Sequence, residues 1–184
     1  MTRCSWVPED NALYCQYHDE EWGRPLTDDQ ALFELLCLES YQSGLSWLTV
    51  LKKRPAFRQA FYNYDIGRVA QMTAADLEKL LQNPALIRHR LKLAATINNA
   101  KAMQVLQEEE GSFSHYLWGF VNHHPLDNQV SDYKQVPNQT VLSQALAKDL
   151  KKRGFKFLGP VTLYSFMQAA GLVNDHELSC DYHF

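Results

Sequence analysis

Residues 27–39, TDDQALFELLCLE, decide the fold class of this chain. Thr27-Asp28-Asp29-Gln30 has the S/T-x-x-E/Q pattern of a capping box, which predicts that a helix begins here. Four apolar residues follow at the spacing of one helix face: Leu32, Phe33, Leu35 and Leu36. The stretch therefore predicts a helix with a buried face, and we expect it to end at Gly44.

The same helical pattern continues on both sides of this stretch. A second helix is predicted through Leu48 and Leu51 towards Pro55, and Asp65 and Thr73 are typical N-caps of two short helices. Further helices are predicted at about 86–110, 140–153 and 161–170, with a polar loop at 122–139. Because no stretch alternates convincingly between apolar and polar residues, the predicted class is all-α. One domain, residues 1–184, suits this length.

The composition is that of an ordinary globular protein. Hydrophobic residues make up 46% and charged residues 21%, which excludes a disordered or fibrous chain. The net charge of −3 excludes a nucleic-acid binder that is basic all over, although a local basic face is compatible with it. No apolar run reaches the roughly 18 residues of a membrane span, and the segment MTRCSWVPEDN contains no apolar signal core. We therefore expect a cytoplasmic protein without a membrane partner, with reduced thiols.

Cysteine and histidine residues occur near both ends of the sequence. Cys4 and His18 lie near the start, and the segment His176-Glu-Leu-Ser-Cys180 lies near the other end, with an i, i+4 spacing that would place the two side chains on neighbouring turns of a helix. Two thiolates and two imidazoles form a closed tetrahedral set that suits structural Zn²⁺, with no position left for a catalytic water. On spacing alone, buried thiols and surface histidines remain an alternative. Cys15 and Cys37 are expected in the core.

Aromatic residues are concentrated in the first 50 positions, around one carboxylate. Glu39 lies on the apolar side of its helix, where a charge is costly unless it is paired. The aromatic residues nearby are Trp6, Tyr14, Tyr17, Trp22, Tyr41 and Trp47. Flat rings and an acceptor-only anion predict a pocket for a planar, cationic, N–H-bearing ligand such as an electron-deficient purine. The alternative is that the rings are core residues and that Glu39 reaches solvent.

Three basic segments stand out against the acidic balance, at 52–54, 88–92 and 151–156. The middle one begins a helix directly after the turn Asn83-Pro84-Ala85. Backbone N–H groups and basic side chains at such a helix start can hold DNA phosphates, with Arg88, Arg90 and Lys92 as the candidate contacts. Solvated helix faces would account for the same charges.

Taken together, these stretches resemble the 3-methyladenine DNA glycosylase I family of bacterial repair enzymes. The resemblance covers nearly the whole chain in order. The matching segments are RCSWV at 3–7, YHDEEWG at 17–23, LFELLCLE at 32–39, GLSWLTVLKKR at 44–54, IRHRLK at 87–92, FVNHHP at 120–125, KKRGFKFLGP at 151–160 and YSFMQAAGLVNDHELSC at 164–180.

The resemblance implies roles for particular residues. Cys4, His18, His176 and Cys180 would hold the zinc. Glu39 and Tyr17 would hydrogen-bond the damaged base, while Trp47 and Trp6 stack on it beside Tyr14 and Trp22. The implied fold is a helix-hairpin-helix glycosylase fold with its hairpin at about 77–95, and Leu45 would lie near the gap left by the extruded nucleotide.

The implied activity is excision of 3-methyladenine from double-stranded alkylated DNA. A monomeric enzyme would flip out the nucleotide and hydrolyse the N-glycosidic bond, leaving an abasic site. Glu39, the candidate catalytic residue, would discriminate by opposing the positive charge of the lesion. A zinc-bound helical module that binds damaged DNA without cleaving it is the alternative; a zinc hydrolase would need an open coordination position.

Two short stretches depart from the family pattern. Ser40-Tyr41 replaces the usual Gly-Gln after the glutamate, and we expect the larger Tyr41 beside the pocket. In the hairpin, Ala85 and Leu91 replace glycines. Because glycine allows the backbone to approach a phosphate closely, this predicts an altered grip on DNA.

Overall fold

A computed structural model describes all 184 residues of the chain. Nine α-helices and two short 3-10 turns account for most of the ordered backbone, and two strands of two residues pair in parallel. The α-helices are α1 (Ala12–Glu20), α2 (Asp29–Gln42), α3 (Trp47–Ala60), α4 (Ile66–Ala70), α5 (Ala74–Gln82), α6 (Arg90–Glu110), α7 (Phe113–Gly119), α8 (Val141–Lys152) and α9 (Pro160–Ala169). The remaining elements are η1 (Tyr62–Tyr64), η2 (Tyr133–Gln135), β1 (Leu126–Asp127) and β2 (Val173–Asn174). The expectation of a helical protein is confirmed.

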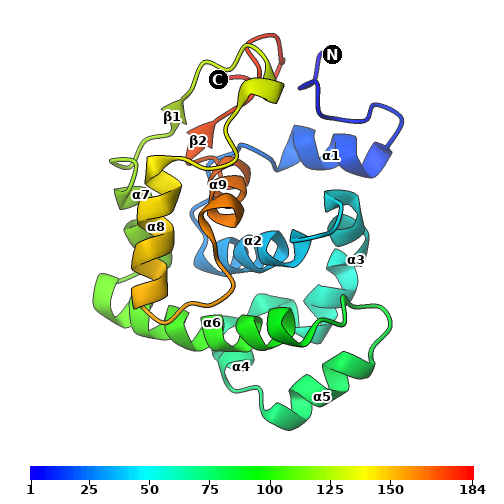
Figure 1. Cartoon of the computed structure of the whole chain (residues 1–184), viewed down its shortest axis with the longest axis vertical. Coiled ribbons are helices and arrows are strands. Elements are labelled where there is room, and N and C mark those ends of the chain that lie inside the picture. The colour runs from blue at the N-terminus through cyan, green and yellow to red at the C-terminus, as the bar shows by residue number, and fades with distance from the viewer.

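The predicted helix α2 lies at the centre of the molecule, between α9 and α3 (Figure 1). It is buried on nearly every side, since ten of its residues have little or no solvent exposure. Its N-cap is Asp28, whose carboxylate accepts a hydrogen bond from the N–H of Ala31 at 2.8 Å. The capping box expected from Thr27 does not form, because the helix begins one residue later, with Asp28 rather than Thr27 as its N-cap.

Local signals predicted several of the other helix starts, whereas α1 and α7 were not predicted and α6 begins at Arg90 rather than at about residue 86. Asp65 and Thr73 are the N-caps of α4 and α5, and Thr73 forms a capping box with Asp76. Helix α3 differs from the prediction, because it continues through Pro55 to Ala60. Proline removes one hydrogen bond from a helix, but Phe57, two residues later, has no solvent exposure, so core packing holds this turn.

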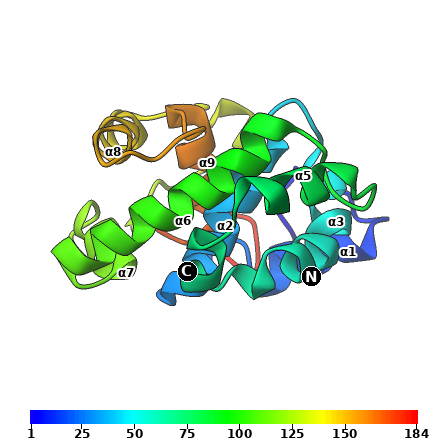
Figure 2. The ribbon, with the colours of Figure 1, turned by 90° about the horizontal axis from the view of Figure 1, so that it is seen from below.

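The long helix α6 runs along one side of the bundle, with α4 and α5 against it (Figures 1 and 2). Residues 83–89 connect α5 to α6, and His89 is the N-cap of α6. On the other side of α2, α8 packs on α9, and the short β1–β2 pair connects the 122–139 loop to the C-terminal segment. The predicted loop therefore contains β1 and η2 but is otherwise irregular.

The N-terminal and C-terminal segments lie at the same end of the molecule, at the top of Figure 1. The N–H of Asp181 donates to the carbonyl of Thr2 at 2.9 Å, and the N–H of Thr2 donates to the Asp181 carboxylate at 2.8 Å. The helix expected for His176–Cys180 is not observed. That segment is a turn closed by a hydrogen bond from Cys180 N–H to the Glu177 carbonyl at 2.8 Å.

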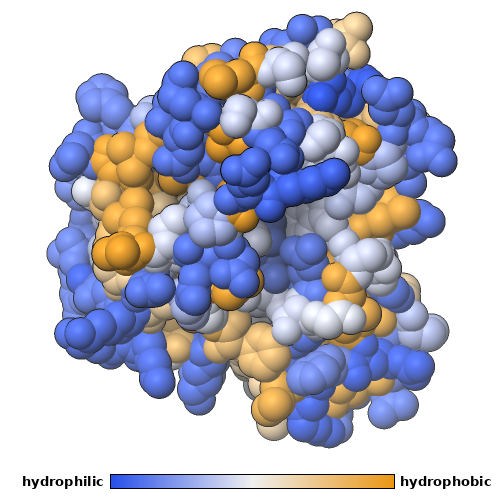
Figure 3. Space-filling view, turned by 45° about the horizontal axis from the view of Figure 1, so that its top comes forward, coloured by the Kyte–Doolittle hydropathy of each residue, from blue (hydrophilic) through white to orange (hydrophobic).

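One continuous core of 45 buried residues joins the helices. On the face shown in Figure 3, hydrophobic residues occur in separate small patches between hydrophilic ones. None of the helices has both the length and the hydrophobicity needed to span a bilayer.

Candidate active site and metal cluster

A cavity of about 110 Å³ opens between α1, α2, α3 and α9. Residues from the first fifty positions line much of it, and all but one of the aromatic residues expected there are present. The residues lining this cavity are Trp6, Tyr14, Tyr17, Trp22, Glu39, Gln42, Trp47, Tyr133, Ser165 and Gln168. It is called the aromatic cavity below.

Glu39 is the carboxylate of the aromatic cavity. Its side chain comes from the last turn of α2 and is 5% exposed. Burial raises its pKa to about 8, and no hydrogen bond or ion pair from the protein acts against this. Since a buried carboxylate is costly unless it receives donors or a positive charge, the cavity is suited to a ligand that brings both.

The rings around Glu39 meet mostly at steep angles. Trp6 makes edge contacts with Tyr14 at 5.8 Å and with Trp22 at 4.8 Å between ring centroids, whereas Tyr17 is tilted against Trp47 at 5.3 Å. Among the side-chain nitrogen and oxygen atoms that are fully shielded from solvent, only the indole N–H groups of Trp6 and Trp47 lack a hydrogen-bond partner. Unpaired buried groups are rare in folded proteins, and both of these belong to this cavity.

The far wall of the cavity comes from residues that the sequence reasoning did not select. Gln42 follows Glu39 on α2, Ser165 and Gln168 come from α9, and Tyr133 comes from η2 in the polar loop. Ser165 and Gln168 lie within the matching segment 164–180, so that segment was the available signal. Nothing local marks Tyr133, because only the path of the 122–139 loop carries it to the cavity.

Tyr41 is not part of the cavity, in contrast to the expectation. Its side chain has no solvent exposure, its ring stacks on Phe57 at 4.4 Å, and its hydroxyl is 2.7 Å from the Thr96 hydroxyl on α6. On α2, Tyr41 is two residues from Glu39, which places it on a different side of the helix. The substitution at this position is therefore a matter of core packing.

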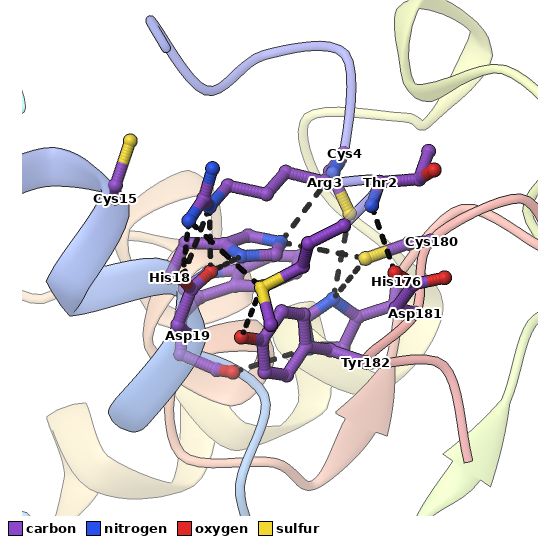
Figure 4. A network of polar contacts seen from close by, with 12 residues as sticks. Thr2, Arg3, Cys4, Cys15, His18, Asp19, His176, Cys180, Asp181 and Tyr182 are labelled. Atoms are coloured by element: carbon purple, nitrogen blue, oxygen red, sulfur yellow. Dashed lines mark hydrogen bonds and ion pairs between the residues drawn. The ribbon is translucent and has the colours of Figure 1, made fainter. Parts of the chain in front are cut away.

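The four residues expected to bind a metal come together in a single buried cluster, formed by Cys4, His18, His176 and Cys180. This group of four candidate ligand side chains is called the metal cluster below. Their ligand atoms all lie within 4.8 Å of one another. Cys4 Sγ is 3.4 Å from His176 Nδ1, and Cys180 Sγ is 3.6 Å from His176 Nδ1 and from His18 Nε2 (Figure 4). Bonds of about 2.0–2.3 Å to zinc place tetrahedral ligand atoms about 3.3 to 3.8 Å apart. These three distances fall in that range, and the four residues could together hold a metal ion.

Neighbouring groups orient both imidazoles. His18 Nδ1 is 2.8 Å from the Asp19 carboxylate, which Arg3 holds from the other side (Figure 4). His176 Nε2 is 3.2 Å from the Trp22 carbonyl. Each ring thus directs its remaining nitrogen to the cluster. Burial lowers the pKa of His176 to about 4, which keeps it neutral, as a ligand must be. Burial also raises the pKa of Cys4 to about 12, so a thiolate here needs a cation beside it.

Gly23 shows how closely the chain packs around this cluster. It has φ +77°, and a side chain on it would come within 2.5 Å of His176 Nε2. A residue other than glycine would displace the imidazole.

The metal cluster lies directly behind the aromatic cavity. The centroid of the Trp22 ring is 4.6 Å from that of His176 and 6.0 Å from that of His18, and the Trp6 and His18 ring centroids are 5.4 Å apart. Glu177 adds a second connection, since its carboxylate accepts from the Ser5 hydroxyl and from the N–H of Tyr133, both at 2.9 Å. Loss of the cluster would therefore loosen two walls of the cavity.

The four candidate DNA contacts have different environments. Leu45 is 40% exposed in the loop between α2 and α3, and Arg88 is exposed in the 83–89 connection. Arg90 is exposed but forms a bidentate ion pair with Glu78 on α5, with N–O distances of 2.5 and 3.0 Å. Lys92 is buried and its ammonium donates to the carbonyl groups of Tyr41 and Ser43, so it is not available to a phosphate. The helix start turns this side chain inward, which the run of basic residues did not reveal.

The fold and the cavity together define a helical protein with an acidic, aromatic binding pocket suited to a flat, cationic ligand. The chain belongs to the methyladenine glycosylase family, whose model matches residues 6–183. It is 52% identical over 179 residues to the DNA-3-methyladenine glycosylase of Haemophilus influenzae, covering 97% of this chain and 96% of the relative.

Solved structures agree with this assignment. A crystal structure of a 3-methyladenine DNA glycosylase I superimposes with a TM-score of 0.96 at 50% identity, and each chain is covered over 100% of its length. The 3-methyladenine DNA glycosylase I of Staphylococcus aureus, described in a study of 3-methyladenine recognition, also gives a TM-score of 0.96. It is 44% identical, and the match covers 100% of this chain and 97% of that one.

Proposed function

We propose that this chain is a DNA glycosylase that excises 3-methyladenine from double-stranded alkylated DNA. It hydrolyses the N-glycosidic bond and leaves an abasic site. Membership of the methyladenine glycosylase family supports the reaction. The observation that places this reaction in the aromatic cavity under our proposal is that the cavity contains the buried Glu39 carboxylate, which has no hydrogen-bond or ion-pair partner in the protein.

Glu39 supplies both affinity and selectivity. Methylation at N3 gives adenine a positive charge in DNA and makes it a good leaving group. That charge and the N–H groups of the base provide what the buried carboxylate lacks, and an ionised Glu39 is stabilised as the lesion enters. Unmodified adenine is neutral and offers no such compensation, so it binds less well.

A base can enter the cavity only after its nucleotide has left the stacked DNA duplex. Unstacking costs a few kcal/mol, which contacts inside the cavity must offset. Trp47 and Trp6 contribute stacking and cation–π attraction, on the order of 1–3 kcal/mol per stacked base. Tyr17 lies beside Glu39, whose charge raises the pKa of this phenol further after burial has raised it, so it remains a hydrogen-bond donor.

The rest of the DNA is held beside the cavity. Leu45 protrudes from the loop that joins the Glu39 helix to the Trp47 helix, and it fills the gap left by the flipped nucleotide. The α5–α6 connection acts as the hairpin of a helix-hairpin-helix motif, where backbone N–H groups and Arg88 meet the phosphates. Arg90 joins them if its exposed pair with Glu78 opens.

The metal cluster holds structural Zn²⁺. Two thiolates and two neutral imidazoles are the donors that zinc prefers, and all four coordination positions are filled by protein. When bound, the ion neutralises the buried thiolates and joins the two ends of the chain. It has no free position for a substrate and takes no part in bond cleavage. A monomeric state and a cytoplasmic location stay predictions.

The direct test is chromatography of the bases released from methylated DNA. The wild-type protein should release free 3-methyladenine, whereas Glu39→Gln should lose most of this activity and Glu108→Gln, an exposed glutamate on α6, should keep it. If the protein binds methylated DNA but releases no base, it is a damage-binding module and the proposed activity is wrong.

A further inference from the structure

Asp175 is a buried carboxylate outside both the aromatic cavity and the metal cluster. It follows β2 and is 1% exposed. Three side-chain donors surround it: the Tyr164 hydroxyl at 2.6 Å, the Asn128 amide at 2.6 Å and the Gln168 amide at 2.7 Å. These three hydrogen bonds compensate for the burial of a charged carboxylate, and the carboxylate in turn fixes the orientation of each donor side chain.

The contact with Asp175 determines which way the Gln168 amide faces. An ionised carboxylate only accepts hydrogen bonds, so the end of the amide that touches it must be the NH₂ group. The carbonyl oxygen of Gln168 then lies on the opposite side, where the Tyr133 hydroxyl is 3.5 Å away. Gln168 and Tyr133 both line the aromatic cavity and Asp175 does not. The amide therefore presents an acceptor on the cavity side.

We propose that Asp175 is a positioning residue that keeps the Gln168 carbonyl oxygen directed at the base, and that Gln168 thereby selects an amino-purine over an oxo-purine. This inference rests on the proposed function, because it concerns the base that the cavity holds. An exocyclic amino group donates to the Gln168 oxygen. A purine carbonyl at the same place sets one acceptor against another, and both lose their hydrogen bonds.

The charge of Glu39 does not make this distinction, because methylation at N3 places the same positive charge on guanine as on adenine. The hydrogen bonds that Glu39 accepts favour an amino group, and Gln168 adds a second acceptor whose direction is fixed. Charge thus separates methylated from unmodified bases, whereas the fixed amide separates the two methylated purines. The amide can do so only while its orientation is fixed, since a freely rotating Gln168 would offer NH₂ to an oxo-purine as readily as its oxygen to an amino-purine.

The test uses DNA methylated with a reagent that alkylates N3 of both purines, and chromatography of the bases that the protein releases. The quantity of interest is the ratio of 3-methyladenine to 3-methylguanine in initial release rates. Gln168→Met keeps the side-chain length but removes the acceptor, and the ratio should fall about tenfold. Asp175→Asn can itself donate to Gln168 and allows the amide to turn over, so the ratio should fall in the same direction.

Tyr164→Phe is the matched control. It removes a neighbouring donor to Asp175 but leaves the contact between Asp175 and Gln168 in place, and the ratio should stay within twofold of wild type. Because Asp175 precedes the cluster residue His176, zinc content is measured for Asp175→Asn. If that variant has lost its metal, Gln168→Met decides the outcome.

An unchanged ratio in Gln168→Met, with 3-methyladenine still released, would overturn the proposal. It is also overturned if Tyr164→Phe lowers the ratio as much as Asp175→Asn, since general loosening would then be the cause. Absence of 3-methyladenine release by the wild-type protein is a different result, which contradicts the proposed function itself.

Discussion

The ammonium group of Lys92 lies 2.7 Å from the carbonyl oxygen of Tyr41 and 2.6 Å from that of Ser43. These oxygens stand at the C-terminal end of α2, where the last carbonyl groups of a helix lack intrahelical partners and favour a cation. Burial lowers the pKa of Lys92. Because α2 carries Glu39 and α6 begins at the candidate DNA segment, Lys92 joins the helix of the aromatic cavity to the proposed DNA-binding segment.

Removal of this contact should destabilise the protein. Lys92→Met keeps the length of the side chain but leaves two carbonyl groups without their donor, at a cost of about 1–3 kcal/mol in the free energy of unfolding. Urea denaturation measures it. Lys101→Met, at an exposed position of the same helix, should change the free energy by less than about 0.5 kcal/mol. Equal losses in the two variants would show that the buried contact contributes nothing.

Glu39 should make the stability of the ligand-free protein fall as pH rises. Its pKa is about 8 in the folded protein against 4.5 when exposed. Between these values the folded protein retains a proton that the unfolded chain has released, so wild-type stability decreases across this window and levels off above it. Glutamine does not titrate. Glu39→Gln should therefore gain stability relative to wild type from about pH 4.5 to about pH 8, by on the order of a few kcal/mol at the upper end.

Melting temperatures of both proteins over this pH range measure the effect, with Glu108→Gln as the control for an exposed glutamate. Two parallel curves for wild type and Glu39→Gln would contradict a buried carboxylate without a partner.

The metal cluster should contribute both to stability and to the shape of the base cavity. Cys180→Ser should lose bound zinc and lower the Tm by more than about 5 °C, because a structural metal stabilises only the folded state. Base affinity should fall with it, since Trp22 and Trp6 pack on the cluster histidines. Elemental analysis and calorimetry measure these quantities. Cys15→Ser, a thiol outside the cluster, should keep its zinc; loss of metal from both variants, or from neither, would argue against the assigned ligands.

Trp47 should provide stacking energy in the cavity. Trp47→Ala should weaken binding of free 3-methyladenine by about 5- to 150-fold, corresponding to 1–3 kcal/mol, whereas Trp47→Phe keeps a flat ring and should lose less. Isothermal calorimetry gives both constants. Trp118→Phe changes a buried tryptophan outside the cavity and should bind the base as wild type does. An alanine variant that binds equally well would exclude Trp47 from the base site.

Arg88 and Arg90 should contribute unequally to DNA binding. Arg88→Ala should reduce the slope of log K against log salt by about 1, the change expected for one lost phosphate contact. Arg90→Ala should change the slope less, because Glu78 already neutralises that guanidinium. Titrations of double-stranded DNA at several salt concentrations separate the two. A larger effect at Arg90 would mean that the pair with Glu78 opens on binding.

Much of the helical framework could be predicted from the sequence, because its signals involve residues only a few positions apart. Thr73 with Asp76 starts α5, and Asp65 starts α4, through hydrogen bonds within one helical turn. The same local reasoning failed where distant contacts compete with it. Helix α3 continues through Pro55 because Phe57 packs in the core. His176 and Cys180 suggested a helix, but the segment between them is a turn, in which the Glu177 carboxylate accepts hydrogen bonds from Ser5 and Tyr133.

The candidate site shows the same division. The residue types around Glu39 predicted a cavity for a flat cation, and the pairs at both ends of the chain were the right set for a metal cluster. Their burial could not be read from spacing. Lys92 and Arg88 stand four residues apart in one basic run, yet one is buried against α2 and the other is exposed.

By itself, the amino-acid sequence determined the helical class, several of the helix starts, the candidate acidic residue, the four possible ligands, and the family. Tertiary structure alone decided that Tyr133 and Gln168 close the cavity, that Tyr41 leaves it, and that Asp175 orients an amide. The physical reason is range. Caps and periodicity depend on hydrogen bonds within a turn, whereas burial, the direction of a side chain and the partner of a charge depend on elements that only meet once the chain has packed.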